Sequence, residues 1–96
     1  MIAGMTASLH DRASPPSVPL LRALWHGLRG EWAAAHEIVQ EDDSAEGAWV
    51  HAWLHRMEGD HPNAAYWYRR AGKPVAEGAT QAEGEAIADA VLAHRM

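Results

Sequence analysis

Two histidines and one glutamate stand at helical spacing near the middle of the chain. His51, His55 and Glu58 occupy positions i, i+4 and i+7, so a helix would place all three on one stripe of its surface. Two imidazoles one turn apart can share a zinc or similar divalent metal ion, and the carboxylate can act as a third ligand or as a base. Further ligands would come from other parts of the fold, and the candidates are His26, His36 and His61.

The same stripe also has an explanation without metal. Its spacing differs from HExxH, the motif that places a general base between two zinc ligands. Every surface helix exposes some polar side chains, so we favour a solvent-facing or hydrogen-bonded histidine pair. In this interpretation no cofactor is expected, and the metal site is kept as the alternative.

Arg69, Arg70 and Lys73 form the most concentrated group of positive charges in the chain. They fall at the end of a predicted helix, where the helix dipole favours cations, and this alone explains their presence. A guanidinium can also hold a carboxylate or phosphate through two parallel hydrogen bonds. If a partner binds, we expect the contacts to come from this cluster and from neighbouring side chains, namely Arg56, Asn63, Tyr66, Arg69 and Arg70.

Aromatic residues are concentrated between positions 48 and 74. The chain has five Trp and no Phe, and Ala supplies much of its apolar content, so large rings are needed to fill the space between helices. We therefore expect four rings to be core residues rather than the wall of a binding pocket, namely Trp25, Trp32, Trp53 and Tyr68. Because consecutive residues of a helix cannot all face the same way, at least one of Tyr66, Trp67 and Tyr68 should be partly exposed.

The composition limits the class of protein. The 96 residues suffice for one domain with a modest core. The net charge of −5 argues against nonspecific binding to nucleic acid or to an anionic membrane, because both require a positive surface. The absence of Cys excludes disulfides, thiolate metal ligands and a thiol nucleophile from this chain. No apolar run approaches the roughly 20 residues of a membrane span, so we expect a soluble, cytoplasmic protein.

Residues 1–16 show no sustained period and end in a Pro-rich stretch, which predicts a flexible tail before a single helical domain at 17–96. Apolar residues then recur at helical spacing, and no stretch alternates for long enough to predict a strand. The predicted helices cover about 17–29, 31–41, 45–58, 61–71 and 80–94, with a loop at 72–79. Their predicted N-terminal caps are Ser17, the Asp43/Glu46 capping box, Asp60 or His61, and the Thr80/Glu83 capping box.

The first four predicted helices form two similar halves. Gly30 aligns with Gly59 and Ala35 with Ala64, at an offset of 29 residues. The stretch "EGDHPNAAYWYRRA" resembles the joint and second helix of a tetratricopeptide repeat. This resemblance implies two stacked antiparallel helical hairpins, and the fifth helix would cap their open end. The predicted fold class is therefore all-α and tetratricopeptide-like.

Residues 30–74 also resemble a group of small bacterial proteins with a tryptophan-histidine-arginine signature, "GEWAAAHEIVQ … WVHAWLHRMEGDHPNAAYWYRRAGKP". This resemblance supplies no catalytic residues. Since no motif indicates a reaction, we favour a binding function over an enzyme, with a protein or peptide partner that carries acidic groups. The alternatives are a small-ligand or metal site at the His51/His55/Glu58 stripe or at Arg69 and Arg70, and a homodimer.

Overall fold

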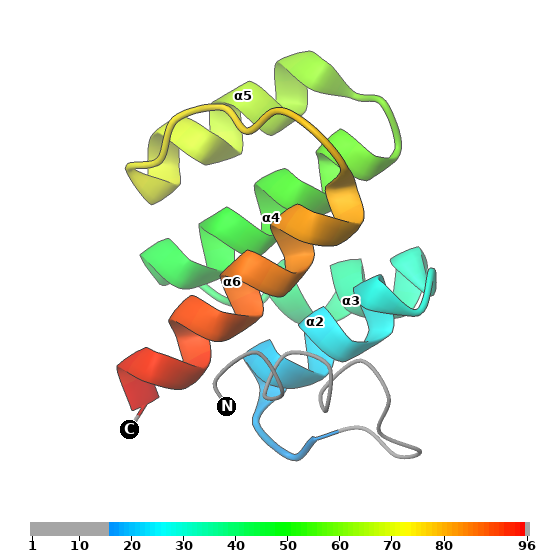
Figure 1. The fold of residues 1–96 in the computed structure, drawn as a ribbon, viewed down its shortest axis with the longest axis vertical. Coiled ribbons are helices and arrows are strands. Elements are labelled where there is room, and N and C mark those ends of the chain that lie inside the picture. Colours follow the sequence, from blue (N-terminus) through cyan, green and yellow to red (C-terminus); the bar gives the residue numbers. More distant parts are fainter. Residues whose placement is uncertain (1–15, 96) are drawn as a thin grey trace.

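The structure is a computed structural model, and it describes residues 16–95. Within this range the chain forms helices joined by loops and contains no strand, so the prediction of an all-α fold is confirmed. The helices are α2 (Pro19–Leu28), α3 (Trp32–Val39), α4 (Ala45–Met57), α5 (His61–Ala71) and α6 (Thr80–Arg95) (Figure 1).

Helix α4 is the centre of the fold. It packs against α2 and α3 on one side and against α5 on the other, while α6 runs alongside it in the opposite direction and also contacts α2 (Figure 1). Neighbouring helices in the chain pair with each other, α2 with α3 and α4 with α5, as expected for two hairpins. Their likeness to stacked tetratricopeptide repeats stays a prediction.

The boundaries of α5 follow the predicted signals. Asp60 is the N-cap, and its carboxylate accepts a hydrogen bond from the backbone N–H of Asn63. Gly72 follows the last turn with φ of 72°, a left-handed conformation that glycine adopts without a steric penalty. The loop at 72–79 then leads back along the molecule to the start of α6 (Figure 1).

Three predicted caps are wrong. Helix α2 begins after Val18, which makes no side-chain cap hydrogen bond, and Ser17 is exposed outside it. For α4 the cap is Ser44, whose Oγ accepts from the N–H of Gly47 at 2.9 Å, so the Asp43/Glu46 box does not form. The Thr80/Glu83 box fails because the carboxylate of Glu83 is used in contacts with other helices, described below.

Trp53 of α4 is the largest fully buried side chain. Two glycines in helix interiors make room for its indole: a Cβ on Gly27 of α2 would lie 2.6 Å from the ring, and one on Gly84 of α6 would lie 2.3 Å from it. Its Nε1–H donates to the carbonyl of Thr80 at 2.7 Å, so the polar atom is satisfied within the core. This ring therefore fixes how closely α2 and α6 approach α4. The predicted core positions of Trp25, Trp53 and Tyr68 are confirmed, whereas Trp32 is only partly buried and packs against the core.

The predicted flexible tail covers residues 1–16, of which positions 1–15 lie outside the described residues. Pro16 is buried, and its carbonyl accepts a hydrogen bond from Nε of Arg22 at 3.2 Å. Between residues 16 and 95, none of the helices combines the length and apolar character needed to cross a membrane.

Candidate functional site

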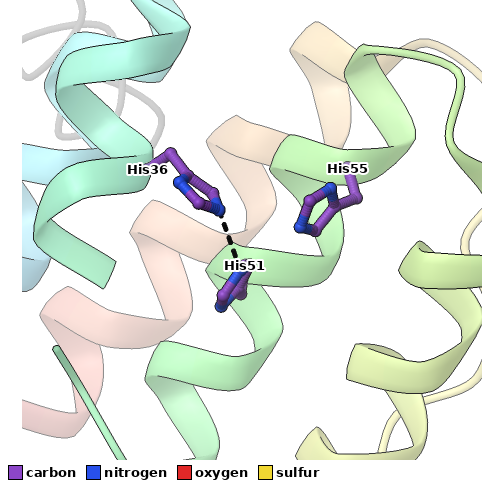
Figure 2. A group of neighbouring side chains, drawn as sticks. All are labelled: His36, His51 and His55. Atoms are coloured by element: carbon purple, nitrogen blue, oxygen red, sulfur yellow. Dashed lines mark hydrogen bonds between the residues drawn. The ribbon is translucent and has the colours of Figure 1, made fainter. Parts of the chain in front are cut away.

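Three histidine rings from two helices meet beside α4. His36 projects from α3, and His51 and His55 project from α4 toward it (Figure 2). The Nε2 atoms of His36 and His51 lie 3.2 Å apart and share a hydrogen bond. One nitrogen from each of the three rings lies within 4.8 Å of the others, so the rings converge on a common point. We call His36, His51 and His55 the three-histidine cluster.

On the α3 side, Trp32 positions His36. The two rings lie one turn apart on the same helix and are stacked, with centroids 4.6 Å apart and planes within 11°. The indole is itself fixed, because its Nε1–H donates to the carbonyl of Leu54 on α4 at 2.6 Å. Trp32 therefore holds the His36 ring against α4, next to His51 and His55.

On the α4 side, His51 and His55 are one turn apart, and their rings are stacked with centroids 5.0 Å apart. The indole of Trp67 on α5 also stacks on the His51 ring, with centroids 3.9 Å apart and planes within 13°. Only 6% of His51 and 7% of His55 is exposed, whereas His36 is half-buried. Solvent thus reaches the cluster mainly beside His36. Of the two predicted alternatives, the pair is not solvent-facing but hydrogen-bonded, His51 to His36 and His55 to Glu58.

Glu58 takes part in the cluster through His55. Its Oε2 lies 2.8 Å from Nδ1 of His55. With Nδ1 occupied, Nε2 is the nitrogen of this ring that remains for the centre of the cluster. The arrangement therefore places the Glu58 carboxylate behind a histidine and not among the converging nitrogens.

The environment favours neutral imidazoles. Burial, followed by the proximity of His36 and His55, lowers the pKa of His51 to about 4. Burial and the charge of His55 also lower the pKa of His36, while Glu58 acts in the opposite direction. At pH 7 both rings are therefore neutral, and an imidazole must be neutral to bind a metal.

The other two candidate ligands lie elsewhere. His26 pairs with Glu31, with Nδ1 and Oε1 2.7 Å apart. His61 is the first residue of α5 and is exposed. Of the three histidines considered as additional ligands, His36 alone joins His51 and His55.

A second group of predicted site residues lies along α5. Asn63, Tyr66, Arg69 and Arg70 are all exposed, with Tyr66 43% accessible. Nη1 of Arg70 donates to the Tyr66 hydroxyl at 3.1 Å, and its guanidinium lies 5.1 Å from the centroid of Trp67. The expectation that one of the three consecutive aromatic residues is exposed is therefore confirmed. We call Asn63, Tyr66, Arg69 and Arg70 the α5 face.

Arg56 does not belong to the α5 face. Its Nη1 lies 2.8 Å from Oε1 of Glu83, and both side chains are about one tenth exposed or less. The guanidinium also donates to the carbonyl of Gly78, and the Tyr68 hydroxyl donates to the second oxygen of Glu83. Burial, together with this hydrogen bond, raises the pKa of Tyr68. Arg56, predicted as a partner-binding residue, thus connects α4 to α6 and to the preceding loop.

The sequence named His36 only as one of three possible additional ligands, and it did not reveal that Trp32 positions this ring. The two stand at i and i+4 on α3, and this spacing was the available signal that they share a face. No local pattern connects them with His51, which lies 15 residues after His36 on another helix. Comparisons with protein-family models, curated proteins and solved structures gave no match to the chain.

Proposed function

We propose that the protein binds one divalent transition-metal ion, zinc or a similar ion, through His36, His51 and His55. The observation that carries the proposal is the convergence of three imidazole nitrogens within 4.8 Å in a largely buried position. Imidazole suits zinc, copper, nickel and cobalt, whereas magnesium and calcium prefer oxygen ligands. The all-nitrogen set therefore favours a late transition metal.

The spacing of the nitrogens agrees with tetrahedral coordination. Two nitrogens bound to zinc at about 2.0–2.1 Å lie about 3.3–3.4 Å apart in a tetrahedron, and about 2.8–3.0 Å apart as neighbours in an octahedron. The Nε2 atoms of His36 and His51 are separated by 3.2 Å, close to the tetrahedral value. The His55 nitrogen lies within 4.8 Å of both, so its side chain would have to move closer to complete the set.

The position of Glu58 supports the same proposal. Histidines that bind metal usually donate their second ring N–H to a carboxylate or carbonyl, which fixes the tautomer and makes the other nitrogen a better ligand. His55 has this arrangement, with Nδ1 2.8 Å from the Glu58 carboxylate. Glu58 would therefore act on the ion through His55.

Zinc binding is tested by calorimetry and thermal unfolding of protein treated with EDTA and then titrated with zinc. We expect one equivalent to bind. Zinc at about 100 times its Kd adds about 2.7 kcal/mol to the free energy of unfolding. For a domain of this size, that stabilisation raises Tm by roughly 10 °C or more.

The matched variants are His36→Gln, which removes a half-buried ligand, and His61→Gln, which removes an exposed histidine outside the cluster. The first should abolish the rise in Tm while the variant remains helical by circular dichroism, and the second should retain it. The proposal is wrong if zinc fails to bind the unaltered protein, or if both variants lose zinc equally.

The α5 face favours a second candidate function, the binding of an acidic segment of a partner protein. It combines exposed guanidinium groups with an exposed tyrosine, and Arg and Tyr often supply much of the binding free energy at protein interfaces. In a chain with a net charge of −5, such a positive patch would attract an acidic segment to one side of the molecule.

A fluorescent glutamate-rich peptide provides the probe, with a lysine-rich peptide of equal length as the comparison. Arg69→Ala with Arg70→Ala should weaken binding of the acidic peptide at least about tenfold, since two charge-assisted contacts are lost. Arg22→Ala with Arg29→Ala removes the same charge from α2 and should leave the affinity nearly unchanged. Equal losses in the two double variants would refute the α5 face as the binding surface.

A further inference from the structure

The three-histidine cluster offers an ion fewer protein ligands than a closed zinc site requires. Structural zinc sites have four protein ligands, whereas catalytic sites have three and leave one position for an exchangeable molecule. Within residues 16–95, no fourth histidine or carboxylate lies among the converging nitrogens of the cluster. The described part of the fold therefore provides three protein ligands and leaves the fourth coordination position of an ion unfilled.

Two carboxylates lie near His55. Glu58 and Asp60 form a separate group with this ring, and Oε2 of Glu58 lies 2.8 Å from its Nδ1. A carboxylate held at Nδ1 cannot at the same time bind an ion placed at Nε2 of the same ring. Glu58 thus strengthens a ligand without filling the fourth position.

The aromatic side chains around the cluster supply no ligand either. Trp67 presents a ring face to His51, and Trp32 presents one to His36. The indole N–H of Trp32 is a donor, and it is already bonded to the carbonyl of Leu54. Because His36 is half-buried, a small molecule from solvent can approach on that side.

Charge decides which kind of molecule would enter. Three neutral imidazoles leave a divalent ion with its full charge of about +2, in a position where His51 and His55 are less than a tenth exposed. An uncompensated charge is costly in such surroundings, so an anionic ligand in the fourth position is favoured over a neutral one.

We infer that the metal centre keeps one coordination position open and that this position takes water, hydroxide or a small monoanion. This inference rests on the proposed metal binding. It identifies the ligand class as small anions that bind directly to the ion, such as azide, cyanate or bicarbonate, and it separates the site from a purely structural zinc centre.

The test uses the full chain loaded with less than one equivalent of Co²⁺, whose visible absorption reports its coordination, followed by titration with sodium azide. We expect intense four-coordinate bands that shift with azide along a saturable curve of one azide per cobalt. The same titration of His61→Gln should give the same shift. His10→Ala and Asp11→Ala, which change potential ligands outside the described residues, should leave the bands unaltered.

The outcomes distinguish the two proposals. If Co²⁺ gives four-coordinate bands that do not respond to azide, or if His10→Ala or Asp11→Ala changes those bands, the fourth ligand is a protein group and the open position is refuted, although metal binding stands. If Co²⁺ does not bind at the cluster, so that His36→Gln leaves the spectrum unchanged, both proposals fail.

Discussion

The carboxylate of Glu58 lies 2.8 Å from Nδ1 of His55, in the last turn of α4. This contact fixes which nitrogen of the ring faces His36 and His51. It also links a half-exposed acid to a buried ring, so the acid can be changed with little disturbance of the core. Substitution of Glu58 can therefore test metal binding by the cluster without removing a buried side chain.

We predict that Glu58→Gln weakens zinc binding about 10- to 100-fold, the usual effect of removing a carboxylate behind a metal-bound histidine. The amide would no longer stabilise the partial positive charge that His55 acquires on binding the ion. Competition with a chromogenic chelator measures the change in Kd. Glu37→Gln removes the same charge from an exposed position on α3 and should leave Kd unchanged. Equal Kd values for Glu58→Gln and the unaltered protein would contradict the assignment of Glu58.

The protein without metal should lose stability in mild acid because of His51. Its pKa is about 4 in the folded state against 6.5 for an ordinary histidine, so below pH 6.5 the unfolded chain binds a proton that the folded chain does not. The free energy of unfolding should therefore be highest above pH 6.5 and should fall as the pH drops toward 4, by up to about 3 kcal/mol from this residue.

Urea unfolding in EDTA at a series of pH values measures this dependence. His51→Phe keeps a ring beside Trp67 but cannot be protonated, so its free energy of unfolding should change less between pH 6.5 and pH 4. His61→Gln should show the same slope as the unaltered protein, because His61 is exposed. An unchanged slope in His51→Phe would show that other groups cause the acid sensitivity.

The pair formed by Arg56 and Glu83 should be required for stability. Both side chains are about one tenth exposed or less, so Glu83→Gln leaves the guanidinium buried without its counter-ion. We expect a loss of about 3 kcal/mol or more in the free energy of unfolding. Glu77→Gln, at an exposed position in the preceding loop, should change it by less than about 0.5 kcal/mol.

A double-mutant cycle with Arg56→Met separates the pair from its surroundings. The double variant should be destabilised by less than the sum of the two single variants, because it contains no unpaired buried charge. Additive losses would mean that Arg56 and Glu83 contribute independently.

Gly84→Ala distinguishes packing from helix propensity. Propensity alone predicts a gain of about 1 kcal/mol, because alanine is favoured over glycine in a helix interior. A Cβ at this position would lie 2.3 Å from the indole of Trp53, which is fully buried and cannot move aside easily. We therefore expect a lower Tm and a broader near-ultraviolet signal from Trp53, whereas a higher Tm would show that the core can adjust.

Local signals in the sequence were sufficient for the helices themselves. The apolar spacing placed α2 to α6 within a few residues of their observed bounds. Asp60 caps the start of α5 and Gly72 follows its end, both at predicted positions. Such signals depend on hydrogen bonds and side chains within a few residues of one another. The error at the start of α6 has a non-local cause, because the carboxylate of Glu83 bonds to Arg56 of α4 and Tyr68 of α5, which no local rule includes. The other two errors concern which of two neighbouring residues is the cap.

The sequence by itself determined that this chain is helical, that Trp53 and Tyr68 are buried, and that His51 and His55 share one face of a helix. The tertiary structure decided that this face is turned inward toward His36 and that Arg56 forms a largely buried ion pair with Glu83. The physical reason is that the rotation of α4 against its neighbours depends on contacts between distant residues, above all the fit of the Trp53 ring against Gly27 and Gly84. Periodicity defines a face of a helix, and packing decides what that face meets.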